Sequence, residues 1–433
     1  MKFERFIAGR FMPRSKDGGG FSGPLSVIAV ASIALGVVVM VMAVSILRGF
    51  QGEIASKVVG FGSHLTVSNY TVNPAYQENP VTLSPTLADD LRSLPGVKHL
   101  QTFATKGGMV KTKEQIYGIL FRGLSADYDS SFFHQNLVEG RLPKLLEHSE
   151  YSDDSDSDIK PSNEVLISLT ISNKLGLKVG DKMRTYFWQG GTAGSNAVAG
   201  GTYRSRAFIV SGIYNTDLPE VDELYVIGDL RQVQKLNDWN DTDVGGYELL
   251  VDDFDQLEEM RFQALDLLTV HNRYDLSVHT IKEAYPALFA WLDLLNSNIT
   301  LILVIMSIVC TVAIVSALLI MIFEKSRTIG ILKALGANNA SIRRIFILKA
   351  SRLILEGIAI GIVLSGTLCF VQSKWQVIKL DAESYHMSHV PVDTDPWIFL
   401  LISVSTAVIC LLALLLPAAY ISRISPAKTI NVE

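Results

Sequence analysis

The chain has 433 residues, of which 48% are hydrophobic and 19% are charged, and its mean hydropathy is +0.29. This composition is too apolar for a disordered chain or an ordinary soluble protein, and three cysteines are too few for a disulfide-stapled secreted domain. It predicts a membrane protein with a large aqueous part, and the net charge of −5 gives no reason to expect a nucleic-acid partner.

Residues 1–25 predict a cytoplasmic amphipathic segment that lies on membrane lipid. Its apolar side chains fall at helical spacing between basic ones, and they are Phe3, Phe6, Ile7 and Phe11. A secretory signal peptide is excluded because the apolar run that follows, 26–47, has 22 residues and is followed by Arg48 instead of a cleavage site of small residues.

Four nearly uncharged stretches are each long enough to cross the hydrocarbon core as a helix. They are residues 26–47, 299–323, 353–371 and 397–421. This number excludes a many-spanned secondary transporter. It leaves a four-helix membrane protein with a 251-residue insert at 48–298 and a short loop at 372–396.

The charge distribution predicts the orientation of these spans. Segments 1–25, 324–352 and 422–433 together hold 14 basic residues and four acidic ones, whereas the insert holds 22 basic and 34 acidic residues. Because basic residues next to spans stay in the cytoplasm, we expect both termini and the 324–352 loop inside and the insert outside.

The insert is predicted to be an α+β domain with one subdomain nested in the other. The first subdomain is discontinuous, at about 62–145 and 240–285, and the nested one covers about 160–239. Predicted strands are 63–70, 98–105, 115–120, 164–168, 182–188, 204–214 and 246–251, predicted helices are 84–94, 169–175 and 256–268, and 223–236 is predicted as a strand followed by a helix.

A glycine-rich, uncharged hairpin loop joins two of these strands. It is either an unstructured connection or a loop that binds a partner. Loops of this length without secondary structure are uncommon, which favours the partner-binding interpretation. The residues proposed for binding are Gln189, Gly190, Gly191, Gly194, Gly200, Gly201 and Tyr203.

No motif for catalysis, nucleotide binding or metal binding is recognised. Residues 176–183 lack the spacing and the hydroxyl of a phosphate-binding loop. The acidic run 151–158 lacks the glycine and glutamate of a calcium loop and is interpreted as a solvated linker. His386 and His389 are two histidines on a short loop, and two potential ligands alone are too few to predict a zinc site.

The 324–352 loop predicts a basic amphipathic elbow made of two helices. The first ends at Gly336, and the second starts near Ala340 and continues into the third span. The elbow either anchors to anionic lipid or docks a cytoplasmic partner. An apolar face at 285–295 leads directly into the second span, which predicts one long helix between the insert and the elbow.

The third span contains small residues and one ionisable residue. Gly357 and Gly361, followed by Gly366, predict a face that packs closely on another span, within the chain or across a dimer. Glu356 has two readings: a polar latch between helices, or a side chain that reaches the cytoplasmic interface.

The order of one span, a large external domain and three spans, together with the sequence EKSRTIGILKALGANNASIRRIFILKASRLILEGIAIGIVLSG at 324–366, resembles the permease subunits of FtsX-like, MacB-type ABC transporters. Residues 3–67 and the closing LLPAAYISRISPAKTINVE are similar to the lipoprotein-releasing permeases of the LolC/LolE family. The resemblance covers nearly the whole chain. The acidic run 151–158 has no counterpart in the family, and the hairpin lacks the proline of the family's hook.

The resemblance implies that this chain is not an enzyme and binds no cofactor itself, because a separate cytoplasmic ATPase supplies the ATP and Mg²⁺ site. It implies that the ATPase docks on the elbow, at Glu324, Lys325, Ile329, Gly330, Leu332, Lys333, Ala334, Leu335 and Gly336. It also implies a bacterial inner-membrane location, a lipoprotein substrate, and a periplasmic lipoprotein chaperone that contacts the 189–203 hairpin.

Four spans are few to enclose a transport route, so we expect a dimer with an identical copy or a paralogue. The leading hypothesis is release of lipoproteins from the inner membrane to a periplasmic carrier. The alternatives are a MacB-like exporter of peptides or toxins, an FtsX-like transmitter that regulates cell-wall hydrolases, and an ATP-independent receptor. The receptor would leave the elbow unexplained.

Overall fold

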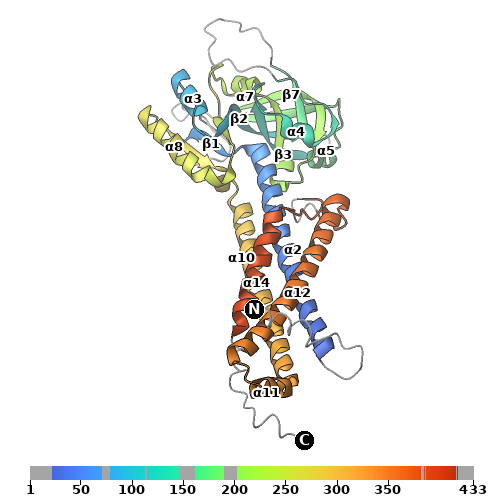
Figure 1. The fold of residues 1–433 in the computed structure, drawn as a ribbon. Helices are drawn as coiled ribbons and strands as arrows, with labels where there is room; N and C mark the ends of the chain where they lie inside the picture. Colours follow the sequence, from blue (N-terminus) through green and yellow to red (C-terminus); the bar gives the residue numbers. More distant parts are fainter. Residues whose placement is uncertain are drawn as a thin grey trace. The chain divides into compact units, whose positions relative to one another are not determined.

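The computed structural model describes residues 22–70, 79–112, 115–145, 161–189, 202–381, 385, 387–415 and 417. Several predicted features lie outside the described residues: the amphipathic face at 3–11, the acidic run 151–158, the hairpin glycines, His386 and the tail 422–433. The chain divides into two compact units (Figure 1). The membrane unit comprises 1–52, 290–379 and 389–433, and the outer unit comprises 53–289 and 380–388.

Four helices are long and apolar enough to cross a membrane, as the sequence predicts. They are α2 (Ser22–Gly62), α10 (Pro286–Glu324), α12 (Asn339–Trp375) and α14 (Pro396–Ala413). Helix α2 continues well past the predicted end of its span at residue 47. Helix α10 starts 13 residues before its predicted span, which confirms the continuous helix expected from the apolar face at 285–295.

The membrane unit has one apolar core. Side chains from α2, α10, α12 and α14, and from the short α11 (Ser326–Ala334), meet in a single buried cluster. One contributor from each helix in chain order is Val37, Ile314, Ile329, Ile354 and Ile402. The helices therefore pack through side-chain contacts within this chain.

A mixed sheet of ten strands forms the outer unit. The strands are β1 (Leu65–Asn69), β2 (Val97–Lys111), β3 (Ile116–Leu124), β4 (Leu137–Gly140), β5 (Glu164–Ser168), β6 (Lys182–Gln189), β7 (Thr202–Tyr214), β8 (Tyr225–Asp229), β9 (Gly246–Val251) and β10 (Leu276–Thr280). Their order is β10-β1-β9-β2-β3-β8-β5-β7-β4, and β6 pairs with β2 and β7. The pairs β3–β8 and β5–β7 are parallel, and the others are antiparallel.

Short helices accompany this sheet. They are α3 (Pro85–Arg92), α4 (Ser131–Gln135), α5 (Leu169–Leu175), α6 (Pro219–Asp222), α7 (Leu230–Asn237), α8 (Leu257–Val270) and α9 (Ile281–Ala284), with a 3₁₀ turn at Phe254–Gln256. Ser84 and Ser168 cap α3 and α5 by accepting bonds from backbone N–H groups in the first turn. Every predicted strand and helix of the insert is present, whereas β4, β10, α4, α6 and α9 were not predicted.

The two predicted subdomains share one sheet. Strands β5 to β8 come from the segment predicted to be nested, yet β8 pairs with β3 and β6 pairs with β2. The nested segment is thus inserted in the chain between β4 and β9 without forming a sheet of its own. Phe121, Phe187 and Phe208 join the two segments in a fully buried aromatic cluster with ring centroids 5.0–6.3 Å apart.

Candidate docking elbow and outer groove

Helix α11 forms the elbow between α10 and α12. Gly336 has φ +89°, which an L side chain rarely adopts, so it ends α11 as predicted. Asn338 then caps α12 by accepting a bond from the Ala340 N–H at 3.3 Å. The elbow is therefore a defined turn between two helices, fixed by local capping.

The predicted docking residues divide into two groups by burial. Ile329 and Gly330 are buried, and Leu332 packs against the membrane core, so these residues hold α11 in place. The other predicted residues are exposed or half-buried: Glu324, Lys325, Lys333, Ala334, Leu335 and Gly336. Leu335 is 80% exposed, and the neighbouring Ile331, which was not predicted, is 49% exposed. Ile331 and Leu335 therefore add exposed apolar side chains to the accessible surface of the elbow.

The predicted glycine face of α12 packs against α2. A Cβ at Gly357 would lie 2.9 Å from Ile33 Cβ, and one at Gly361 would lie 2.8 Å from Val37 Cβ. Both distances are shorter than van der Waals contact, so only glycine permits this helix pair to approach so closely. Gly366 is less constrained, because its nearest neighbour would be Phe399 at 3.9 Å.

Glu356 forms an ion pair with Arg352 one turn earlier in α12, with Arg352 Nε 2.9 Å from Glu356 Oε1. Its side chain is 44% exposed. Glu356 is thus paired with a neighbour on the same helix.

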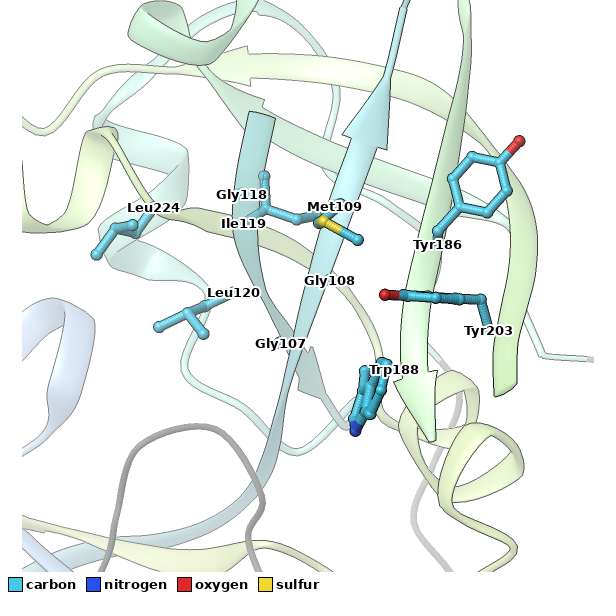
Figure 2. Close-up of a pocket in the computed structure, with 10 residues that line it drawn as sticks. All are labelled: Gly107, Gly108, Met109, Gly118, Ile119, Leu120, Tyr186, Trp188, Tyr203 and Leu224. Atoms are coloured by element: carbon cyan, nitrogen blue, oxygen red, sulfur yellow. The ribbon is translucent and has the colours of Figure 1, made fainter. Parts of the chain in front are cut away.

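A groove lies beside the base of the predicted hairpin (Figure 2). Strands β6 and β7 pair up to Gln189 and Thr202, and Trp188 and Tyr203 face each other at 5.2 Å between ring centroids. The hairpin is thereby confirmed, although its glycines lie outside the described residues. The groove has a volume of about 440 Å³ and is lined by Gly107, Gly108, Met109, Gly118, Ile119, Leu120, Tyr186, Trp188, Tyr203 and Leu224.

A second cavity, of about 450 Å³, contains a buried ion pair of the sheet. Arg122 Nη2 lies 2.5 Å from Glu248 Oε1, and the two side chains are 6% and 2% exposed. Gln101 donates to the other carboxylate oxygen at 3.0 Å, and the guanidinium carbon lies 4.7 Å and 5.0 Å from the ring centroids of Phe61 and Phe103. Burial is the largest single influence and lowers the pKa of Arg122, but Glu248 together with the nearby tyrosines outweighs it, so the pKa is raised.

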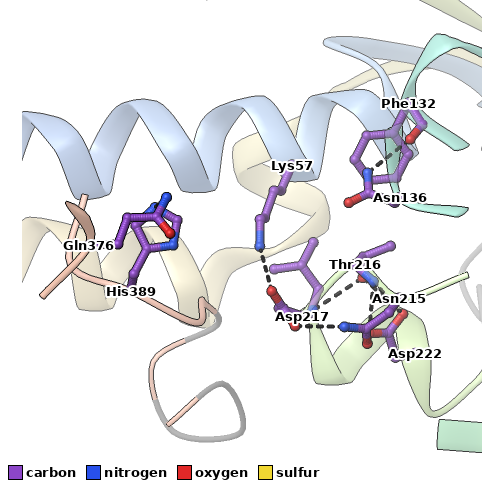
Figure 3. Close-up of polar contacts among 10 residues, drawn as sticks. Lys57, Phe132, Asn136, Asn215, Thr216, Asp217, Asp222, Gln376 and His389 are labelled. Atoms are coloured by element: carbon purple, nitrogen blue, oxygen red, sulfur yellow. Dashed lines mark hydrogen bonds and ion pairs between the residues drawn. The ribbon is translucent and has the colours of Figure 1, made fainter. Parts of the chain in front are cut away.

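Polar contacts connect the end of α2 with the loop before α6 (Figure 3). Lys57 Nζ lies 3.4 Å from Asp217 Oδ2, and Asn215 donates to the other oxygen of Asp217 at 2.8 Å. Asp222 accepts bonds from the backbone N–H and the hydroxyl of Thr216. Burial raises the pKa of Asp222 to about 6, although the hydrogen bonds from Thr216 act in the opposite direction.

Sequence reasoning missed most of the groove. It selected Tyr203 and Gln189 at the hairpin base, but not Met109, Leu120 or Trp188. One sequence signal could have revealed the groove: β3 and β6 carry apolar residues on both faces. In β3, Ile116 and Leu120 face outwards while Ile119 and Phe121 face inwards. The ion pair between Arg122 and Glu248 gave no local signal, because its partners lie 126 residues apart.

Two family models match this chain: the MacB-like periplasmic core domain over residues 26–267 and the FtsX-like permease C-terminal region over 300–426. The chain is 24% identical over 431 residues to the lipoprotein-releasing system transmembrane protein LolC of Xylella fastidiosa, covering 97% of both chains. It is 23% identical over 437 residues to the corresponding LolE of Haemophilus influenzae, covering 98% of both.

A shorter similarity involves the macrolide export ATP-binding/permease protein MacB of Burkholderia thailandensis, at 31% identity over 116 residues, which is 26% of this chain and 18% of that protein. The core-domain model alone covers more than half of the chain, and the permease model covers α12, α14 and most of α10. This chain belongs to the family of FtsX-like permeases that carry a MacB-like periplasmic core domain.

Proposed function

We propose that this chain is the permease subunit of an ABC transporter that releases lipoproteins from the inner membrane and passes them to a periplasmic carrier. The observation that carries the proposal is the similarity, along 97% or more of the chain, to proteins named as lipoprotein-releasing. Both termini and the elbow lie in the cytoplasm, in agreement with the basic segments that flank the spans.

The energy source is a separate cytoplasmic ATPase, which binds ATP and Mg²⁺ and docks on the elbow. Exposed Ile331 and Leu335 offer it an apolar contact, while buried Ile329 fixes α11 to the membrane core. Because α10 is one helix from Pro286 to Glu324, a displacement of the elbow is transmitted along it as a rigid rod of about 58 Å.

The transporter contains two permease chains, this one and a second copy or a paralogue. A periplasmic lipoprotein chaperone receives the substrate at the hairpin, whose described base is formed by β6 and β7.

Depletion of the protein tests this function directly. We expect mature lipoproteins to accumulate in the inner membrane fraction, and wild-type protein supplied from a second gene copy to restore their release. Leu335→Asp, which replaces an exposed apolar side chain on the elbow, should be produced normally but fail to restore release. Normal lipoprotein distribution after depletion would refute the proposal.

A second candidate is export of small molecules or peptides, favoured by the partial similarity to a macrolide exporter. It predicts that depletion increases macrolide sensitivity without changing lipoprotein distribution. Measuring both properties in the same depleted cells separates the two functions.

A further inference from the structure

The outer face of β2, β3 and β6 is apolar around Met109, Leu120 and Trp188, where an exposed sheet face is normally polar. The basic residues Lys111 and Arg184 follow beyond this patch on the same face. On the inner face Phe121 and Phe187 are fully buried in the core. On the outer face Met109, Trp188 and Tyr203 remain 37%, 46% and 51% exposed. A concave surface lined by aromatic and aliphatic side chains is typical of ligand-binding sites.

Glycine gives this face its concave shape. A Cβ at Gly118 would meet nothing within 4 Å, so the missing side chain leaves open space above β3. Gly118 pairs with Met109, which in turn pairs with Tyr186. The open space at Gly118 therefore lies in one row with two side chains that line the groove. The volume of about 440 Å³ is within the range of ligand pockets.

The chemistry of the lining selects an uncharged, flexible apolar ligand. None of the ten lining residues carries a charged side chain, and the only polar side-chain groups are two phenols and an indole N–H. A charged group inside the groove would lose its hydration without gaining a partner among the lining residues. A peptide would bring an N–H and a C=O at each residue, while β2 is already paired with both β3 and β6 along the groove.

We propose that this groove binds a saturated acyl chain, the part of a lipoprotein that must be kept from water after it leaves the membrane. The proposal rests on the proposed function and adds to it a lipid-binding site in the periplasmic core domain. The uncharged lining of the groove supports the proposal, because an alkyl chain gains free energy from leaving water and needs no hydrogen bond.

The test uses palmitic acid with a photoreactive diazirine at its terminal carbon, added to the full-length protein in lipid nanodiscs. After irradiation, mass spectrometry locates the labelled peptides. We expect labelling of peptides from β2, β3 and β6 in addition to the membrane helices. Gly118→Leu should lower labelling of these strands roughly tenfold by filling the groove.

Two matched variants serve as controls. Gly118→Ala adds only a methyl group to the same open space and should retain most of the labelling. Gly52→Leu adds the same side chain at another glycine whose Cβ would meet nothing within 4 Å and should leave labelling of the strands unchanged. Labelling of the membrane helices should be equal in all variants and reports that each protein is intact.

The proposal is overturned if the probe labels only the membrane helices, or if Gly118→Leu and Gly118→Ala label the strands equally. It is also overturned in favour of a protein interface if Gly118→Leu abolishes capture of the periplasmic carrier while the strands are never labelled. These outcomes are separate from the proposed function, because lipoprotein release is measured in cells and can persist without acyl binding at this groove.

Discussion

Replacing Glu248 by glutamine should destabilise the outer unit more than any surface charge replacement. The substitution keeps the shape of the side chain but leaves the guanidinium of Arg122, 6% exposed, without its counter-charge. Removing one partner of a buried ion pair costs about 3–5 kcal/mol, and we expect about 3 kcal/mol because glutamine can still accept a hydrogen bond. For a unit of this size, that is a decrease in melting temperature of roughly 6–12 °C.

The assay is thermal unfolding of the full-length protein in detergent, followed by near-UV circular dichroism. Glu223→Gln is the control, since its ion pair with Lys174 is exposed at 53% and 43% and is worth about 0–1 kcal/mol. The double variant Arg122→Met/Glu248→Leu should recover much of the lost stability, because apolar replacements of a buried pair are often neutral. Equal melting temperatures for Glu248→Gln and Glu223→Gln would refute this reasoning.

Three further predictions concern other parts of the chain. Gly361→Leu should lower the stability of the membrane unit by about 1–3 kcal/mol through overlap with Val37, and Gly366→Leu should lower it less; equal thermal shifts would contradict the packing argument. Because the pKa of Asp222 is raised to about 6 in the fold, the outer unit should lose up to about 3 kcal/mol of stability as pH rises from about 4 to 6. Asp222→Asn should remove this pH dependence from urea unfolding curves, and an unchanged slope would exclude Asp222 as its source. Leu335→Asp should abolish co-purification of the ATPase without changing the melting temperature, whereas Ile329→Asp should unfold the elbow by burying a charge; a stable Ile329→Asp protein would contradict the assignment.

The membrane part could be predicted because its signals are local. Four nearly uncharged stretches of sufficient length specify four helices whatever their neighbours are. Gly336 and Asn338 specify the elbow in the same way, through a positive φ and a side-chain cap. Local signals indicate which residues form α11. They do not indicate which face of α11 meets the core of the membrane unit, and this decides that Ile329 is buried and Leu335 is exposed. Both residues were therefore predicted to lie in one docking surface.

The outer sheet was predictable strand by strand but not as a whole. Alternating apolar residues and flanking turn residues locate β5 and β9 to the residue, because each run is bounded on both sides. Strand order depends on pairing between distant segments, and β1 is hydrogen-bonded to β9 and β10, which follow it by about 180 residues or more. The two predicted subdomains appeared separate in the sequence for that reason, although their strands form one sheet.

The residues that line the groove are determined by the pairing register of β2, β3 and β6, which the amino-acid composition of these strands does not reveal. Met109 lies opposite Gly118 on one side and Tyr186 on the other, so the row across three strands has one absent side chain next to two large ones. A slip of one residue between β2 and β3 would place Gly108 or Val110 opposite Gly118 and turn Met109 to the inner face, where Phe187 already fills the space beside Gly108. The same aromatic cluster that forms the core therefore fixes the register, and the register places the open position of Gly118 among apolar walls. A binding face in this domain is thus set by packing on the opposite face of the sheet, and substitutions at Phe187 should alter ligand binding even though its side chain is fully buried.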